Sequence, residues 1–170
     1  MAGLTVWLTG LPSSGKTTLA VGLAERFRGE GRPVEVLDGD NVRTQLTRDL
    51  GFSRQDRAEN VRRVGYVAHL LSRNGVVAVC ALVSPYRADR DDVRALHDGR
   101  FVEVHVSAPL EVCTARDVKG LYARQRAGEL HGLTGVDDPY EPPLRPEVVV
   151  STDLQTVDES LDTIWRSIRR

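Results

Sequence analysis

The sequence predicts an α/β fold, with one parallel β-sheet covered by helices on both faces. Strand and helix patterns alternate along the whole chain. The run 76–83 is continuously apolar, which is typical of a strand buried on both faces of a parallel sheet. A chain of 170 residues has room for one domain with a real core, so residues 1–170 are predicted to form a single domain.

Composition and charge exclude several classes of protein. Hydrophobic residues make up 41% of the chain and charged residues 28%, as in folded globular proteins rather than disordered ones. The net charge of −1 argues against nucleic-acid binding, which usually needs a basic surface. No apolar run approaches the roughly 18–20 residues of a membrane-spanning helix. We therefore expect neither nucleic acid nor membrane among the partners.

The first residues and the two cysteines indicate a cytoplasmic protein. Residues 1–3 lead directly into a strand pattern, without the basic and apolar regions of a secretory signal. Cys80 and Cys113 form no metal or redox motif, so we expect two buried thiols in a reducing compartment.

Each element has a local signal in the sequence. We expect strands at 4–8, 33–37, 76–83, 101–106 and 147–150. We expect helices at 15–29, 53–74, 88–97, 109–116 and 156–168. Ser53 with Asp56, and Thr156 with Glu159, are typical pairs at a helix N-terminus. Residues 117–145 are polar and lack a clear period, which predicts a mobile lid or a disordered stretch, and we expect a lid.

The first strand leads into a phosphate loop. The segment is Gly10-Leu11-Pro12-Ser13-Ser14-Gly15-Lys16-Thr17, which matches G-x-x-x-x-G-K-T. Its glycines let backbone N–H groups surround phosphate oxygens, and the following helix directs its positive end at the same anion. Lys16 is expected to reach the β- and γ-phosphates, and the Thr17 hydroxyl to bind Mg²⁺. The strand–loop–helix context disfavours a glycine-rich turn without a ligand, so we predict a P-loop NTPase-type fold.

Lysine is almost absent from this chain. Of 23 basic residues only Lys16 and Lys119 are lysine. A lysine that persists against such a bias is one that arginine cannot replace, and we apply this interpretation to Lys16. For Lys119 composition alone favours chance.

Two carboxylates, Asp38 and Asp40, flank Gly39 at the end of the second predicted strand. Such a pair can hold a magnesium-bound water or accept a proton from an acceptor hydroxyl. The same residues fit an Asp-Gly turn with a helix cap at Asp40 or Asn41. The residues alone leave both interpretations open.

An arginine-rich segment follows. Residues 43–63 contain six arginines against three acidic residues. Guanidinium groups match phosphate and sulfate oxygens, so this surplus suits an anionic acceptor, although a solvated helix face explains about half of them. Phe52 lies among them, either as a core residue or as a ring that stacks on a base. The chain length and the absence of an N-K-x-D guanine motif favour a small-molecule kinase.

Several segments resemble the adenylylsulfate (APS) kinase family. They are 37–43 (L-D-G-D-N-V-R), 49–53 (D-L-G-F-S), 56–63 (D-R-A-E-N-V-R-R), 84–90 (S-P-Y-R-A-D-R) and 119–122 (K-G-L-Y). The resemblance covers about residues 4–152. It implies phosphorylation of the 3′-hydroxyl of adenosine 5′-phosphosulfate by MgATP, which gives 3′-phosphoadenosine 5′-phosphosulfate (PAPS) and ADP in sulfate activation. It also implies a homodimer, and an association with ATP sulfurylase is open.

The resemblance assigns roles residue by residue. The ATP-binding set is Gly10, Leu11, Pro12, Ser13, Ser14, Gly15, Lys16, Thr17, Thr18 and Arg116. The acceptor-binding set is Asp38, Asp40, Arg43, Phe52, Arg57, Asn60, Val83, Ser84, Lys119 and Leu133. The catalytic set is Lys16, Asp38, Asp40 and Ser84, and the Mg²⁺ set is Thr17 and Asp40.

Three of these roles carry the implied mechanism. Asp40 matches the general base, and Phe52 matches an aromatic residue that stacks on the acceptor adenine. Ser84 matches a serine described in the family as a phosphoserine intermediate. Direct in-line transfer needs only positioning and charge neutralisation, so we expect Ser84 to donate a hydrogen bond instead.

The chain departs from the family pattern mainly in the lid. Leu133 stands where the family has a phenylalanine over the second face of the acceptor adenine, and Leu130 or Tyr140 are alternative covers for that face. Val118, Ala123 and His131 also differ. These departures keep open a kinase for another sulfated or nucleotide hydroxyl. A non-catalytic PAPS-binding module is a third hypothesis, which the intact Lys16, Thr17 and Asp40 disfavour.

Overall fold

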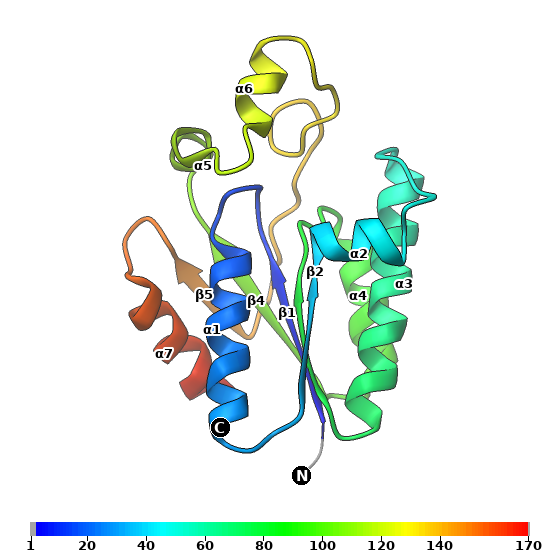
Figure 1. Ribbon diagram of the computed structural model, residues 1–170, viewed down its shortest axis with the longest axis vertical. Coiled ribbons are helices and arrows are strands. Elements are labelled where there is room, and N and C mark those ends of the chain that lie inside the picture. Colours follow the sequence, from blue (N-terminus) through cyan, green and yellow to red (C-terminus); the bar gives the residue numbers. More distant parts are fainter. Residues whose placement is uncertain (1–2, 170) are drawn as a thin grey trace.

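Parallel strands form the centre of the protein, in the order β2-β3-β1-β4-β5 (Figure 1). The computed structural model describes residues 3–169. Its strands are β1 (Leu4–Thr9), β2 (Val34–Asp38), β3 (Val77–Ala81), β4 (Phe101–Ser107) and β5 (Val148–Ser151). Every neighbouring pair is parallel, so the predicted fold class is confirmed.

Helices cover both faces of this sheet (Figure 1). They are α1 (Lys16–Gly29), α2 (Gly39–Gln45), α3 (Arg54–Arg73), α4 (Arg87–Leu96), α5 (Leu110–Arg116), α6 (Leu121–Arg126) and α7 (Val157–Ile168). Helices α1 and α7 pack on one face, and α3 and α4 on the other. Within the described residues, no helix is long and apolar enough to cross a membrane.

Strand side chains alternate between two hydrophobic cores. Val6 and Leu8 of β1 join the core under α1 and α7, whereas Trp7 joins the core under α3. Strand β3 divides in the same way, with Val79 in the first core and Cys80 in the second. Burial on both faces explains the continuous apolar run of β3. Cys80 and Cys113 are both buried and free, as expected.

Two short helices were not predicted from the sequence. Helix α2 begins directly after β2, and its N-cap is Asp38, whose carboxylate accepts a hydrogen bond from the Asp40 N–H at 3.1 Å. A cap at Asp40 or Asn41, one of the two interpretations of this turn, is therefore wrong. Helix α6 lies inside the lid and is too short to show a period. The carboxylate of Asp117 accepts from two N–H groups of its first turn.

The lid lies above the carboxyl ends of the strands (Figure 1). It has a small hydrophobic core of its own, in which Tyr122 and Leu133 pack with Cys113 and Leu11. The Tyr122 hydroxyl donates to the Pro12 carbonyl at 2.9 Å. Residues 117–145 are thus packed onto the phosphate loop rather than structureless.

The expected cap of the last helix is present. The Thr156 hydroxyl accepts from the Glu159 N–H at 3.2 Å, and the Glu159 carboxylate accepts from the Thr156 N–H at 2.8 Å. This reciprocal pair satisfies two N–H groups that the helix itself leaves without partners.

Thr156→Ala is expected to lower the free energy of unfolding by about 1 kcal/mol, because a donor in the first turn of α7 loses its acceptor. Urea unfolding followed by circular dichroism measures the change. Thr156→Ser keeps the hydroxyl and serves as the control. Equal stability of the alanine and serine variants would contradict the capping role.

Candidate active site

A cavity of about 940 Å³ opens at the carboxyl ends of the strands. The loops after β1, β2 and β3 line it from below, and lid residues line it from above. All but three of the residues assigned to the site from the sequence line this cavity. The exceptions are Gly10, Leu11 and Ser14, which face Lys16 from within the phosphate loop.

The phosphate loop adopts a conformation that depends on its glycines. Gly15 has φ 102°, in the left-handed region that side chains disfavour. A Cβ at Gly10 would lie only 2.4 Å from the Val106 carbonyl oxygen, so the loop turns directly against β4. Helix α1 begins at Lys16, so its positive end faces the cavity.

The Lys16 side chain folds back along this loop. Its ammonium donates to the carbonyl oxygens of Leu11 at 2.7 Å and Gly10 at 2.9 Å. Only 9% of the residue is exposed, and this burial lowers the pKa of Lys16 to about 8. The cavity therefore holds a desolvated ammonium on the floor of a phosphate-binding loop.

Two carboxylates, those of Asp38 and Asp40, line the cavity together with Lys16. The Thr17 hydroxyl donates to Asp38 at 2.7 Å, whereas Asp40 pairs with the Lys119 ammonium of the lid. Both lysines of the chain thus line the same cavity. Composition alone did not distinguish Lys119 from a lysine retained by chance.

Arg57 joins the acceptor side of the cavity to the lid. It is 8% exposed and donates from Nε to the Phe52 carbonyl at 2.8 Å. Its other nitrogens donate to the Thr134 hydroxyl at 2.5 Å, to the Gly132 carbonyl and to Asp138 at 3.2 Å. The guanidinium is thereby fixed within the wall of the cavity.

Phe52 is not a core residue. It is 62% exposed and lines the cavity, and the Arg43 guanidinium lies 4.5 Å from its ring centroid. Asn60 is buried and accepts the Thr47 hydroxyl at 2.7 Å through Oδ1, which leaves its amide N–H groups for other partners. An exposed ring beside guanidinium and amide donors can bind a planar, anionic ligand.

Ser84 is held by the protein around it. It is 3% exposed, has φ 40°, and its hydroxyl accepts the Trp7 indole N–H at 3.1 Å. Trp7 is itself buried in the core under α3. The Ser84 hydroxyl is thus part of a buried contact at the cavity wall.

Leu133 is 6% exposed and reaches the cavity from the core of the lid. Of the two alternative covers for an adenine, Leu130 lines the cavity, whereas the Tyr140 hydroxyl bonds Thr9 at 3.0 Å and Tyr140 is not among the lining residues.

Thr152 is a cavity residue that sequence reasoning missed. Its hydroxyl donates to the Ser14 carbonyl at 2.7 Å, and its own carbonyl accepts from Arg116 at 2.7 Å. It thereby joins the phosphate loop to the end of α5. Its place two residues after the last predicted strand, 147–150, was the signal that could have found it.

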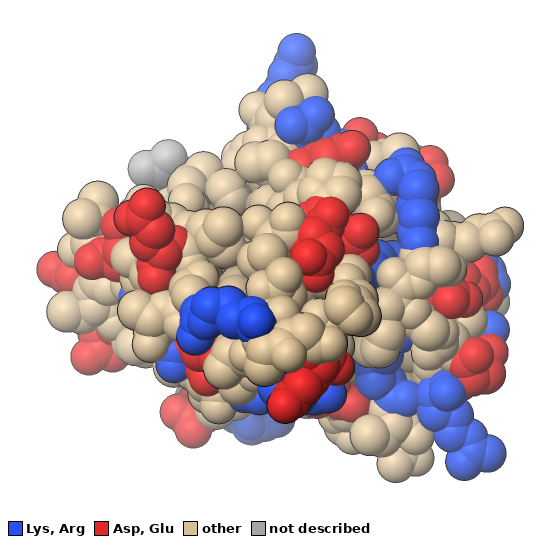
Figure 2. Space-filling view, turned by 90° about the horizontal axis from the view of Figure 1, so that it is seen from above, with Lys and Arg blue, Asp and Glu red and all other residues tan. Residues whose placement is uncertain are grey.

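The face of the molecule that carries the lid has a mixed charge. Basic and acidic side chains are interspersed on it around uncharged surface (Figure 2). It lacks the broad basic face that nucleic acid requires.

Comparison with known proteins shows the family to which the chain belongs. The profile of the adenylylsulphate kinase family matches residues 2–151. The chain belongs to the adenylylsulphate kinase family. The adenylyl-sulfate kinase of Rippkaea orientalis is 56% identical over 166 residues, which cover 98% of this chain and 91% of that protein.

Solved structures of the family have the same fold. The Mycobacterium tuberculosis APS kinase in complex with AMPPNP and APS superposes with a TM-score of 0.95 at 40% identity, covering 99% of each chain. A hexameric APS kinase from Thiobacillus denitrificans superposes with a TM-score of 0.75 at 37% identity. That match covers 99% of this chain and 29% of that one.

In this family member, removal of the Lys16 charge is expected to stabilise the ligand-free protein. Its pKa in the folded state, about 8, lies below the usual 10.5, so the unfolded chain binds more protons between these pH values. The penalty is complete below pH 8 and fades as the pH rises to 10.5.

Lys16→Met should therefore raise the free energy of unfolding at pH 7 by about 1–3 kcal/mol, with a smaller gain at pH 9.5. Urea titrations at both pH values measure this. Lys119→Met breaks an exposed ion pair with Asp40 and should lower the free energy of unfolding by less than about 1 kcal/mol. A loss of stability in Lys16→Met at pH 7 would contradict this electrostatic description.

Proposed function

We propose that the protein is an adenylylsulfate kinase, which transfers the γ-phosphoryl group of ATP to the 3′-hydroxyl of APS and releases PAPS and ADP. One observation supports this most directly. The phosphate loop and the carboxylates Asp38 and Asp40 face each other across a single cavity, beside an exposed Phe52. A donor phosphate and an acceptor hydroxyl can meet there, and family membership identifies the acceptor.

The phosphate loop holds the donor. Backbone N–H groups of the phosphate loop, to which Pro12 contributes none, and the N-terminus of α1 bind the β- and γ-phosphates. When ATP enters, the Lys16 ammonium exchanges its carbonyl partners for phosphate oxygens, and its charge stabilises the transferring group. Arg116 and Thr18 lie at the same end of the cavity as further ATP contacts.

A magnesium ion fits the oxygen groups at this position. Thr17 and Asp38 lie 2.7 Å apart, with Asp40 on the following turn, and hydroxyl and carboxylate oxygens suit Mg²⁺. Within residues 3–169, no cluster of three or more His, Cys, Asp or Glu could hold a metal alone. Mg²⁺ usually completes its shell with water and substrate phosphates, and it neutralises phosphate charge. Asp38 is thus a candidate ligand beside Thr17 and Asp40.

Asp40 serves as the general base. Its carboxylate accepts the proton of the acceptor 3′-hydroxyl as the oxygen attacks phosphorus. The Lys119 ammonium pairs with the Asp40 carboxylate and orients it before the acceptor arrives. Phe52 stacks on the adenine, while Arg43, Arg57 and Asn60 position the ribose and the phosphosulfate.

The phosphoryl group passes directly between the two nucleotides. The buried Ser84 hydroxyl accepts from the Trp7 indole N–H at 3.1 Å and donates to the Leu82 carbonyl at 3.4 Å, so both of these partners belong to the protein and we assign Ser84 a structural role. Val83 and Ser84 form the wall beside the acceptor.

Self-association is part of the same proposal. We expect a cytoplasmic homodimer, and the hexameric relative supports self-association within the family. Light scattering of the purified chain measures its mass, and a monomer at every concentration would contradict the dimer. Mixing with ATP sulfurylase in the same measurement tests that association.

The reaction itself is tested with the purified protein, ATP, Mg²⁺ and APS. ADP is followed by a coupled assay, and the nucleotide product is identified by mass spectrometry. ADP and PAPS are expected in equal amounts. Turnover with a different sulfated or nucleotide acceptor, but not with APS, would contradict the acceptor. PAPS binding without any ADP release would indicate a binding module.

Asp40→Asn is expected to lower kcat by about 10²–10⁴-fold, because the amide cannot accept the proton. Asp49→Asn makes the same change outside the cavity, at a carboxylate paired with Arg63, and should keep kcat within about twofold. Ser84→Ala should keep measurable turnover. Normal turnover in Asp40→Asn, or none in a folded Ser84→Ala, would contradict these roles.

Leu133→Phe is expected to tighten APS binding by a few-fold, because a flat ring replaces an aliphatic contact on the adenine. Phe52→Ala should weaken APS binding more strongly, and the KM for ATP should change little in both. Leu144→Phe adds the same ring at an exposed lid position outside the cavity and serves as the control. APS titrations at fixed MgATP measure all three. Unchanged affinity in Leu133→Phe would show that Leu133 does not cover the adenine.

A further inference from the structure

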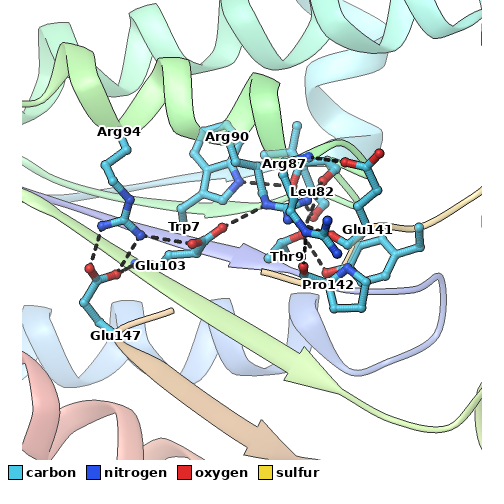
Figure 3. Close-up of polar contacts among 12 residues, drawn as sticks. Trp7, Thr9, Leu82, Arg87, Arg90, Arg94, Glu103, Glu141, Pro142 and Glu147 are labelled. Atoms are coloured by element: carbon cyan, nitrogen blue, oxygen red, sulfur yellow. Dashed lines mark hydrogen bonds and ion pairs between the residues drawn. The ribbon is translucent and has the colours of Figure 1, made fainter. Parts of the chain in front are cut away.

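Arg90 of α4 is the most completely buried charged side chain in the described part of the protein. It is 1% exposed and lies behind the cavity wall rather than in it. Figure 3 shows its guanidinium pointing from α4 toward Glu103 on β4. Nε donates to the Glu103 carboxylate at 2.8 Å. A buried cation needs such a partner, because an unpaired charge in the core is strongly destabilising.

The partner carboxylate is itself held by a second arginine. The other oxygen of Glu103 accepts from Arg94 at 3.0 Å, and Arg94 makes two hydrogen bonds to Glu147, at 2.5 and 3.0 Å. Glu147 also accepts the Glu103 N–H at 2.7 Å. Glu103 therefore remains paired with Arg94 even without Arg90. Neutralising Glu103 uses only Nε of Arg90 and does not explain the hydrogen bonds of its other two nitrogens.

The first of the remaining donors holds the turn after β3. The Nη1 group of Arg90 donates to the Ser84 carbonyl at 2.5 Å. Ser84 has φ 40°, a left-handed conformation that costs a non-glycine residue about 1–3 kcal/mol unless its surroundings enforce it. The same carbonyl accepts a longer bond, 3.4 Å, from the Thr9 hydroxyl of β1. Arg90 thus fixes the direction of a turn whose other side lines the acceptor end of the cavity.

The second donor holds the segment by which the chain leaves the lid, residues 139–142, here called the lid return. The Nη2 group of Arg90 donates to the Glu141 carbonyl at 2.7 Å. The Glu141 N–H donates to the Pro85 carbonyl at 2.8 Å, and the Glu141 carboxylate accepts the Arg87 N–H at 2.8 Å. The Tyr140 ring lies 5.8 Å from the Arg90 guanidinium. One guanidinium therefore bonds both the Ser84 turn and the lid return.

From this geometry we infer that Arg90 is a positioning residue for phosphoryl transfer. Its planar guanidinium bonds the Ser84 carbonyl and the Glu141 carbonyl together, and so fixes the position of the acceptor wall relative to the lid return. The inference rests on the proposed kinase function for its effect on turnover. A lysine at position 90 can keep the ion pair with Glu103. Its single ammonium on a flexible chain cannot also hold the Ser84 and Glu141 carbonyls in the fixed geometry of a planar guanidinium. Small displacements of the acceptor reduce turnover steeply, because in-line transfer depends on alignment.

Arg90→Lys tests this inference, with Arg94→Lys as the matched control. Arg94 shares the Glu103 contact but touches neither carbonyl. In Arg90→Lys we expect the KM for APS to rise by about tenfold and kcat to fall by about tenfold, with the KM for ATP within about twofold. Hydrogen exchange in the nucleotide-free protein should be at least about tenfold faster at the Glu141 N–H. Arg94→Lys should change each quantity by less than about twofold.

The double change Arg90→Gln with Glu103→Gln removes both charges and covers the case in which Arg90→Lys does not fold. We expect the same result in it, a higher KM for APS and a lower kcat with little change in the KM for ATP. Wild-type KM for APS and wild-type exchange in a folded Arg90 variant would overturn the inference. Equal losses of turnover in the Arg90 and Arg94 variants, in proportion to their losses in free energy of unfolding, would also overturn it. If the wild-type protein does not turn over APS, the kinase proposal fails, and hydrogen exchange still decides whether Arg90 holds the lid return.

Discussion

All strands of the sheet run in one direction, and this constraint places the loops after β1, β2 and β3 at a single edge. The middle position of β1 puts the phosphate loop at the centre of that edge, next to β3 and one strand from β2. Asp38 ends β2 and Ser84 follows β3, so donor and acceptor groups meet without any long excursion of the chain. The lid, residues 117–145, covers the cavity from above.

The site contains features that a merely stable protein would avoid. Lys16 is buried with an unfavourable charge, Ser84 has a left-handed backbone, and Phe52 exposes its ring to water. The first two are maintained by rigid surroundings: the loop carbonyls hold Lys16, and Trp7 and Arg90 hold Ser84. Such preorganisation suits phosphoryl transfer, in which the protein contributes alignment and electrostatics rather than covalent chemistry.

Most of the fold and much of the site were predictable from the sequence, because strand periodicity and the phosphate loop are local signals. The sequence pattern could not decide the roles of Asp38 and Asp40, since the same residue types serve as helix caps and as cavity carboxylates. Asp38 is in fact both. The partners of Arg57 and Arg90 depend on contacts between distant segments, which no spacing encodes. Helix α6 is held by Asp117 and by the hydrogen bond from the Tyr122 hydroxyl to the Pro12 carbonyl, and it is too short for its own residues to show a period.

The central claim is that the phosphoryl group moves directly from ATP to the acceptor across this edge of the sheet. The stereochemistry at phosphorus tests it most directly, with ATP made chiral at the γ-phosphorus by oxygen isotopes and APS as the acceptor. One in-line displacement inverts the configuration, and inversion is the expected result. Retention would require two displacements through a phosphorylated residue. It would contradict direct transfer and the structural role given to Ser84.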